Sequence, residues 1–407
     1  MVSKQRKHRY FIFSILLVVV LIAAFVFLNK DSKILPEQEQ EPEVESEMES
    51  DSKTETPEEV LATDKISNAV ASKTELQYVD EDYGRQKLDM PQGAVPLGMA
   101  NGELIYYCVK DVGNGTEGLL FYQFFAQDTE GSSSRMIAET EPCSIGLDAF
   151  LIGEKIFYPN TGRSDDPVIK FQLFSLSGEV ETILEFASDS LPEVDVSEND
   201  IVYSYEYQEE ERTIQKIVNY NLLTKEKTVI REAEYTMDEN ICNGILLDEI
   251  KATGQGVLFQ EIQFEKEEMF LDETGSARVI FYDYESKTNE ELFELPYKLA
   301  SIGGTKDCVL LNEYSYAKPK TNTGKLLNRT GDGYEVYEIR QIGTIDDIKN
   351  TWVFEDYMII QCNYKTIIIN RNSMEFSLIG NTQNVCIGDG TLIVQCEDET
   401  YMIGNTF

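Results

Sequence analysis

The sequence predicts an all-β domain built from repeated units, preceded by one apolar helix and a polar linker. Two observations predict the β domain. From about residue 75 onward, short stretches rich in Tyr, Phe, Ile and Val alternate with Gly, Asn and Asp, which is the pattern of strands and turns. A turn followed by an apolar strand also returns seven times, at intervals of about 35 to 55 residues. A third observation, an apolar run over residues 10–28, predicts the helix.

The seven recurring strands define the repeat. They read NGELIYYCV from Asn101, IGEKIFYPN from Ile152, ENDIVYSYEY from Glu198, GQGVLFQEI from Gly254, TKDCVLLNEY from Thr305, FEDYMIIQC from Phe354 and GDGTLIVQC from Gly388. Six of the units continue into a second hairpin, such as FQLFSLSGEVETILEF and IIINRNSMEFSLIG. The seventh unit ends early, at Phe407, and lacks one outer strand. We expect the segment Glu75 to Asp82 to supply that strand, since this would close a ring and remove two open sheet edges.

These motifs resemble a β-propeller of the TolB-like kind found in bacterial envelope proteins. The resemblance covers residues 74–407 and implies seven four-stranded blades closed by an N-terminal strand, with six or eight blades as alternatives. It implies a scaffold role and brings no catalytic residue to a position of this sequence. A two-sheet sandwich or two smaller β domains are the alternative folds.

The first 73 residues predict a membrane anchor. Residues 10–28 (YFIFSILLVVVLIAAFVFL) are long enough and apolar enough to cross a bilayer as one helix. Lys4, Arg6, Lys7 and Arg9 precede the helix, so the positive-inside rule places the stub 1–9 in the cytoplasm and the β domain outside it, at the cell membrane. A cleaved signal peptide is the alternative, although FVFLNK at the end of the run does not resemble a cleavage site. Residues 29–73 are acidic and contain no aromatic side chain, which predicts a disordered linker.

The residue inventory excludes several classes of protein. A net charge of −38 repels nucleic acid, which we exclude as a partner. The single histidine is His8, in the stub, so the outer domain has no imidazole for a Ser-His-Asp or Cys-His mechanism or for a His-containing zinc site. We expect no catalytic residue, metal or cofactor. The seven cysteines are expected mostly as buried small hydrophobic residues, with a Cys386–Cys396 disulfide left open.

Two predicted loops are candidates for ligand binding. One runs from Glu261 to Glu273 and offers Phe264 and Phe270 as aromatic anchors, and the other carries the basic residues Lys318, Lys320, Lys325 and Arg329. Together they predict a docking surface for an envelope protein or a cell-wall glycan. The simpler interpretation is that the acidic and basic loops pair with each other. A glycan-active enzyme that uses two carboxylates is the alternative function.

Overall fold

The computed structural model describes residues 74–80, 83–111, 119–129, 133–162, 168–187, 191–269, 275–295, 301–312, 324–331, 333–339, 348–397 and 399–404. These residues belong to one compact unit. All of their regular elements are β-strands, so the predicted all-β class is confirmed for this part of the chain. No helix among them could span a membrane, and the predicted segment 10–28 lies outside the described residues.

The strands form six hydrogen-bonded sheets whose order follows the chain. The first two sheets are four-stranded meanders. One contains β4 (Ala94–Ala100), β5 (Glu103–Asp111), β6 (Leu120–Asp128) and β7 (Ser134–Glu139). The other contains β8 (Phe150–Ile152), β9 (Lys155–Asn160), β10 (Ile169–Ser175) and β11 (Val180–Phe186).

The third sheet has eight strands and consists of two consecutive meanders. The first comprises β12 (Val194–Ser197), β13 (Asp200–Glu209), β14 (Arg212–Asn221) and β15 (Lys227–Asp238). The second comprises β16 (Ile241–Ala252), β17 (Gly256–Glu268), β18 (Ser276–Asp283) and β19 (Thr288–Leu295). We call it the joined sheet.

The remaining three sheets complete the order and include strands from the N-terminal side. The fourth holds β20 (Ser301–Thr305), β21 (Cys308–Asn312), β22 (Gly324–Thr330) and β23 (Gly333–Ile339), with β1 (Thr74–Glu75) at its edge. The fifth holds β24 (Ile348–Val353), β25 (Tyr357–Cys362), β26 (Lys365–Asn370) and β27 (Glu375–Gly380), with β2 (Gln77–Tyr78). The sixth holds β28 (Thr382–Gly388), β29 (Thr391–Cys396) and β30 (Thr400–Ile403), with β3 (Gln86–Leu88).

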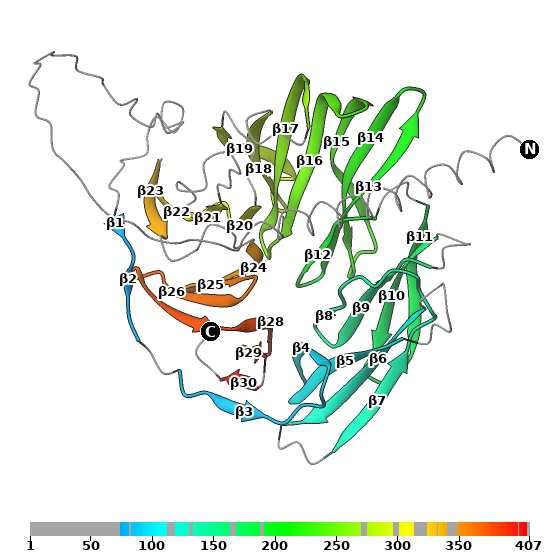
Figure 1. The fold of residues 1–407 in the computed structure, drawn as a ribbon, viewed down its shortest axis with the longest axis vertical. Helices are drawn as coiled ribbons and strands as arrows, with labels where there is room; N and C mark the ends of the chain where they lie inside the picture. The colour runs from blue at the N-terminus through cyan, green and yellow to red at the C-terminus, as the bar shows by residue number, and fades with distance from the viewer. Residues whose placement is uncertain are drawn as a thin grey trace, which may run out of the picture. The chain divides into compact units, whose positions relative to one another are not determined.

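The meanders follow one another around a common centre, as in a β-propeller (Figure 1). The recurring strands identified from the sequence are β5, β9, β13, β17, β21, β25 and β29, the second strand of each meander. Two of the turns leading into them are Asn101-Gly102 and Asp389-Gly390, both with positive φ at each residue. This geometry suits the tight turn of a twisted hairpin, and it explains why the repeat is visible in the sequence.

Buried clusters lie between each pair of consecutive meanders. Between the second and third, the ring of Phe171 packs edge-on against those of Phe157 and Tyr203, at centroid distances of 5.2 and 5.0 Å. The last and first meanders share a cluster that includes Leu88, Tyr106 and Ile393. The hydrophobic core is therefore a cyclic series of inter-sheet layers, not one central mass.

Strands β1, β2 and β3, which we call the belt, run along the outer edges of three sheets (Figure 1). β1 and β2 pair in parallel with β23 and β27, and β3 pairs antiparallel with β30. Between the first two, the side chain of Leu76 is buried in the cluster shared by the fourth and fifth sheets. The Tyr83 hydroxyl lies 2.6 Å from Ser377 Oγ. The belt thus ties three sheets together.

The prediction that Glu75 to Asp82 closes the last sheet is wrong. The fourth strand of that sheet is β3, which begins four residues after Asp82. Leu88 is 4% exposed and fills the cluster between the last and first meanders, whereas Tyr78 packs against Phe376 of the fifth sheet. A strand from the N-terminal side does complete the last sheet, but this strand is Gln86–Leu88 and not Glu75 to Asp82.

All seven cysteines are free, and five of them are buried. The expected role as small buried hydrophobic residues is confirmed for those five. Cys386 lies opposite Ile393 and Cys396 opposite Thr382, so the two sulfurs are not cross-strand partners and form no disulfide.

Candidate functional site: a groove on the joined sheet

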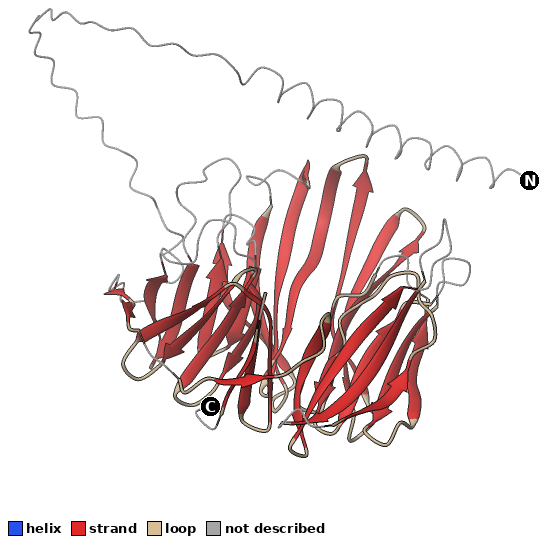
Figure 2. Ribbon diagram, turned by 60° about the horizontal axis from the view of Figure 1, so that its bottom comes forward, coloured by secondary structure: helices blue, strands red, loops and turns tan. Residues whose placement is uncertain are grey.

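The joined sheet departs from the rest of the fold because two consecutive meanders share one hydrogen-bonded ladder. β15 and β16 pair only from Tyr235 opposite Gly244 to Asp238 opposite Ile241. Nearer the ring the two strands separate, and the two meanders pack face to face over a hydrophobic cluster that contains Ala233 and Leu247. β15, β16 and β17 have 12 or 13 residues each, and Figure 2 shows the longest strands extending past the others.

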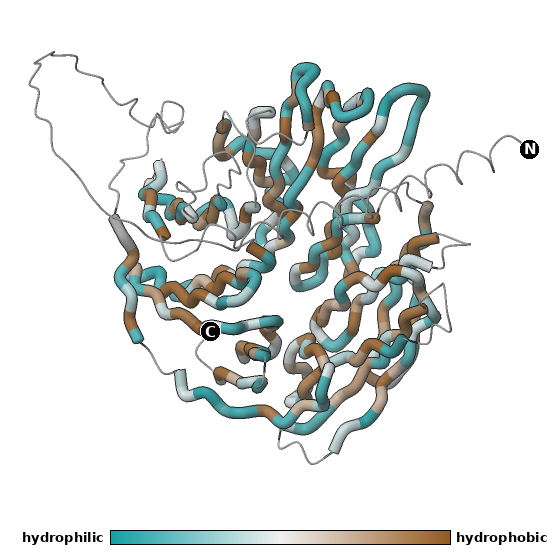
Figure 3. The backbone as a smooth tube through the Cα atoms, viewed as in Figure 1, coloured by the Kyte–Doolittle hydropathy of each residue, from teal (hydrophilic) through white to brown (hydrophobic). Residues whose placement is uncertain are grey.

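The two faces of this extension differ in polarity. One face carries a small core of its own, made of Cys242, Ile262 and Phe264 with Tyr235 and Leu246 packed against it. Strand alternation places the next side chains on the opposite face. We call that opposite face the polar face, and it comprises Glu232, Glu234, Thr236 and Asp238 of β15 with Ile241, Asn243 and Ile245 of β16. Figure 3 shows hydrophilic colouring over the turns at the ends of these strands.

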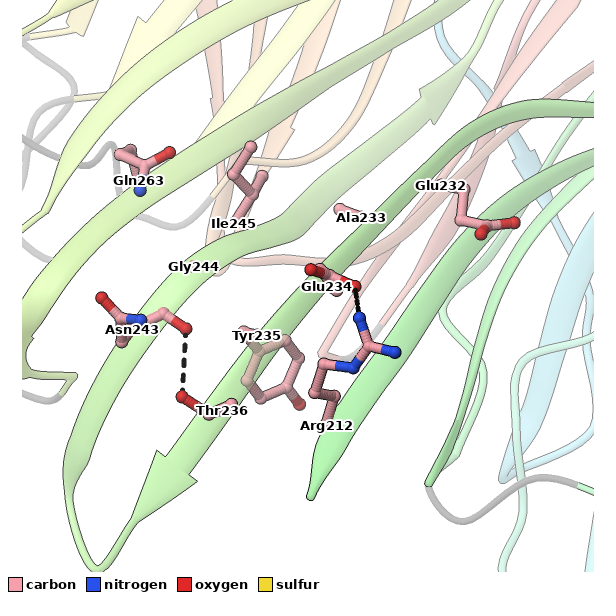
Figure 4. A pocket seen from close by; sticks show the side chains of 10 residues that line it. All are labelled: Arg212, Glu232, Ala233, Glu234, Tyr235, Thr236, Asn243, Gly244, Ile245 and Gln263. Carbon is pink, nitrogen blue, oxygen red and sulfur yellow. Dashed lines mark hydrogen bonds and ion pairs between the residues drawn. The ribbon is translucent and has the colours of Figure 1, made fainter. Parts of the chain in front are cut away.

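A groove of about 420 Å³ lies where β15 and β16 separate (Figure 4). Arg212 Nη1 donates to Glu234 Oε2 at 2.6 Å across its wall, and Thr236 Oγ1 donates to the Asn243 carbonyl oxygen at 3.4 Å. The side-chain amides of Asn243 and Gln263 add further donors and acceptors. The groove therefore offers hydrogen bonds and charges to a ligand, together with apolar surface from Ala233, Tyr235 and Ile245.

Gly244 makes the joint between the two meanders possible. Its φ is +125°, a region that L side chains rarely adopt. A Cβ at this position would collide with the backbone carbonyl oxygen of Glu234 and lie 2.7 Å from the Cα of Tyr235. Only glycine lets β16 approach β15 closely enough to form the wall of the groove.

A buried ion-pair cluster lies between the two meanders below the groove. Glu261 on β17 is 3% exposed and forms ion pairs with Arg231 of β15 and Arg278 of β18, the latter at 2.7 Å. If either arginine were removed, the desolvation cost of the buried Glu261 carboxylate would no longer be fully compensated. The cluster fixes the orientation of the two meanders beneath the groove.

Carboxylates also connect the innermost strands. Glu193 Oε1 accepts a hydrogen bond from the Ile250 amide, and Asp195 Oδ2 accepts one from the Ala252 amide, each at 2.8 Å. Burial and the nearby Asp248 and Glu249 raise the pKa of Glu193 to about 8, against the opposing effect of Lys251. Burial also raises the pKa of Asp195. Both side chains serve as acceptors for the backbone of β16, which gives them a structural role.

The predicted acidic loop is largely strand. β17 extends to Glu268, and Phe264 is 1% exposed, in the small core of the extension. The prediction of Phe264 as an exposed anchor is therefore wrong, because the ring packs against Cys242 and Ile262 on the apolar face. Phe270 lies outside the described residues.

The predicted basic loop is also part strand, and the rest of it lies outside the described residues. Lys325 and Arg329 belong to strand β22, and Lys325 is 9% exposed, so neither lies in a loop. Arg329 Nη2 lies 3.5 Å from Glu290 Oε1, on β19, and its guanidinium lies over the ring of Tyr334. Lys318 and Lys320 lie outside the described residues, so their part in ligand binding stays a prediction. Of the basic segment, Arg329 thus pairs with the neighbouring strand β19.

The groove was not predicted from the sequence. Its residues are ordinary polar side chains on strands, and the contact between β15 and β16 joins two units of the repeat, which strand patterns do not reveal. One signal was present in the sequence: Gly244 interrupts the segment 241–252, which the structure shows to be one strand.

No family model matches the chain, and no curated protein matches it. The solved structures that resemble the chain include the following three. The β-propeller domain of the Trilobed protease from Pyrococcus furiosus is 13% identical with a TM-score of 0.47, over 77% of this chain and 94% of that one. An acylaminoacyl peptidase from Pyrococcus horikoshii is 11% identical with a TM-score of 0.48, over 80% of this chain and 54% of the peptidase.

An uncharacterized protein from Listeria monocytogenes is 13% identical with a TM-score of 0.42, over 79% of this chain and 92% of that one. Identities this low transfer no activity to the chain. The propeller-like arrangement rests here on the order of the strands and on the inter-sheet cores.

Proposed function

We propose that this chain is a membrane-anchored β-propeller of seven blades that acts as a binding module outside the cytoplasm. Counting the joined sheet as two blades gives seven, and β3 completes the last one. The support for the membrane anchor is the apolar run 10–28 with its preceding basic residues. The partner is a component of the cell envelope, either a protein or a cell-wall glycan.

The groove on the joined sheet is the observation that favours binding. It lies on strands that extend beyond the ring (Figure 2), its wall depends on Gly244, and charged and polar side chains line it. Rigid strands position such groups better than loops do. In contrast, the carboxylates with raised pKa, Glu193 and Asp195, accept hydrogen bonds from the backbone. We therefore favour a binding module over a carboxylate-based enzyme.

Proximity labelling in the native cell tests this function. A labelling enzyme fused after Phe407 marks the neighbours of the full chain, and the same fusion is made with Gly244→Val and with Gly93→Val. The first substitution distorts the groove, whereas a Cβ at Gly93 meets no atom within 4 Å. We expect Gly244→Val to lose specific neighbours that Gly93→Val keeps. Identical labelling patterns for all three chains would show that the joined sheet is not the binding site.

Protease treatment of intact cells tests the predicted location separately. With the β domain outside the cytoplasm, added protease should remove it after the cell wall is opened, while a cytoplasmic protein survives. Protection of the β domain under those conditions would overturn the proposed orientation.

A further inference from the structure

We infer that the groove binds an extended cationic polypeptide, laid along β15 on the polar face. This inference rests on the proposed function and specifies the partner of the same site. It is drawn from the charge of the extension, the spacing of its carboxylates and the shape of the groove.

Charge favours a cationic partner. Within the described residues 205–216, 232–245 and 261–269, nine acidic side chains are exposed against two basic ones, Arg212 and Lys266. Arg212 is paired with Glu234, and Asp238 and Glu265 have no ion pair among the described residues. Such a concentration of one sign on a projecting element attracts the opposite charge and speeds association.

Spacing favours an extended chain. Glu232 and Glu234 alternate along β15 on one face, with Asp238 two positions beyond Thr236. Alternate residues of a strand lie about 6.8 Å apart. An extended peptide with basic side chains at every second position repeats this spacing and can face the carboxylates one by one. The nearest cations to Glu232 and Glu234 are Lys216 at 2.8 Å and Arg212 at 2.6 Å.

These existing ion pairs do not block the groove. The side chains of Glu232, Glu234 and Arg212 are each about half exposed, with 54%, 58% and 46% of their surface accessible. The Arg212–Glu234 pair is exposed on both sides, and such a pair contributes little, typically about 0–1 kcal/mol, so an incoming lysine or arginine can replace it. Lys216, the partner of Glu232, is 20% exposed. The partner's aliphatic stems would then cover Ile241, which is 38% exposed, and Ile245.

Other features fit a peptide better than a small cation. No three metal-ligating side chains converge anywhere in the part of the chain that the structure describes, so the carboxylates of the polar face are spread out and do not form a chelate. Asn243 and Gln263 instead bring side-chain amides to the groove, and these can pair with the N–H and C=O groups of a peptide backbone.

Fluorescence anisotropy with the full-length chain tests the inference. The probe is a labelled 12-residue peptide of alternating lysine and threonine, compared with a peptide of the same composition in which lysines and threonines are grouped in blocks. The variant Asp238→Asn/Glu265→Gln removes two charges from the extension. The matched control Glu154→Gln/Glu355→Gln removes two exposed charges elsewhere.

We expect the alternating peptide to bind with a Kd that rises about tenfold in Asp238→Asn/Glu265→Gln and less than twofold in the control. Equal affinity for the alternating and block peptides, or equal losses in both variants, would mean general attraction to an acidic surface and would overturn the inference. Absence of measurable binding at low salt would overturn it as well. If proximity labelling nevertheless shows neighbours that depend on Gly244, the proposed function survives and the partner is not cationic.

Discussion

The two sides of the ring join neighbouring meanders in opposite ways. In the joined sheet, β15 and β16 continue one ladder across two meanders and extend outward. In the fourth and fifth sheets, the meanders stay separate, and β1 and β2 of the belt are added to their outer edges. An open strand edge invites pairing with other chains. One side therefore uses its edges to build a projecting surface, while the other covers them with its own N-terminal residues.

The largest effect is expected from shortening the belt. A chain beginning at Thr74 retains the whole belt, and a chain beginning at Tyr83 retains only β3. A chain beginning at Pro91 retains none of the belt. Loss of β3 exposes the buried Leu88 and leaves the last sheet with three strands, so the chain from Pro91 should lose at least about 3 kcal/mol of unfolding free energy relative to the chain from Tyr83. Loss of β1, β2 and Leu76 alone should cost about 2 kcal/mol.

Urea denaturation of the three chains measures both steps. Equal stability of the chains from Pro91 and Tyr83 would contradict closure of the last sheet by β3.

The second-largest loss of stability is expected from breaking the buried ion pairs of the joined sheet. Glu261→Gln leaves Arg231 and Arg278 facing each other without their carboxylate, and we expect a loss of about 2–3 kcal/mol, since both arginines keep partial contact with water. Glu291→Gln is the matched control, because Glu291 is 48% exposed and lies 3.9 Å from the same Arg278. The control should change the stability by no more than about 0.5 kcal/mol. Comparable losses in both would show that burial of Glu261 is not what matters.

The substitution Gly244→Ala tests the pairing of β15 with β16. The added Cβ meets the Glu234 carbonyl in a backbone conformation that alanine avoids, so we expect a loss of about 2 kcal/mol and faster amide exchange over residues 235–244. Gly93→Ala, which has positive φ in open space, should cost about 1 kcal/mol and leave that exchange unchanged. Unaltered exchange in Gly244→Ala would mean that β15 and β16 tolerate a wider separation.

The smallest effect, taken per pH unit, is a pH dependence. The pKa of Glu193 is raised from 4.5 to about 8, so the folded protein binds this proton more tightly than the unfolded chain does. The contribution of Glu193 to the free energy of unfolding should fall as pH rises from about 4.5 to about 8, by at most about 1.4 kcal/mol per pH unit. Glu193→Gln keeps an oxygen for the Ile250 amide and should flatten this slope. Glu154→Gln, at an exposed turn, should leave the slope as it is.

Local patterns predicted the fold better than they predicted the site. The turn and strand signals are encoded within a few residues, as at Asn101-Gly102 and Asp389-Gly390, so the repeat and the all-β class could be read directly. The closing strand was misplaced because Gln86–Leu88 (QKL) has one apolar residue and no alternating pattern, and only the cluster around Leu88 identifies it as the closing strand. Phe264 was misplaced because a strand of 13 residues was taken to end at its usual length. The groove arises from contact between two units, which no single segment records.

The belt also determines how the domain would respond to tension. If the chain is held at a membrane through residues 10–28, any pull on the domain reaches it at Thr74 and acts first on β1, then on β2, and only afterwards on β3. β1 and β2 have two paired residues each, so they can detach one after the other while the ring stays closed. A modest load would lengthen the tether and uncover the edges of β23 and β27 before it threatened the fold. β1 and β2 would then detach under load before the ring opens, which would protect the fold that carries the binding surface.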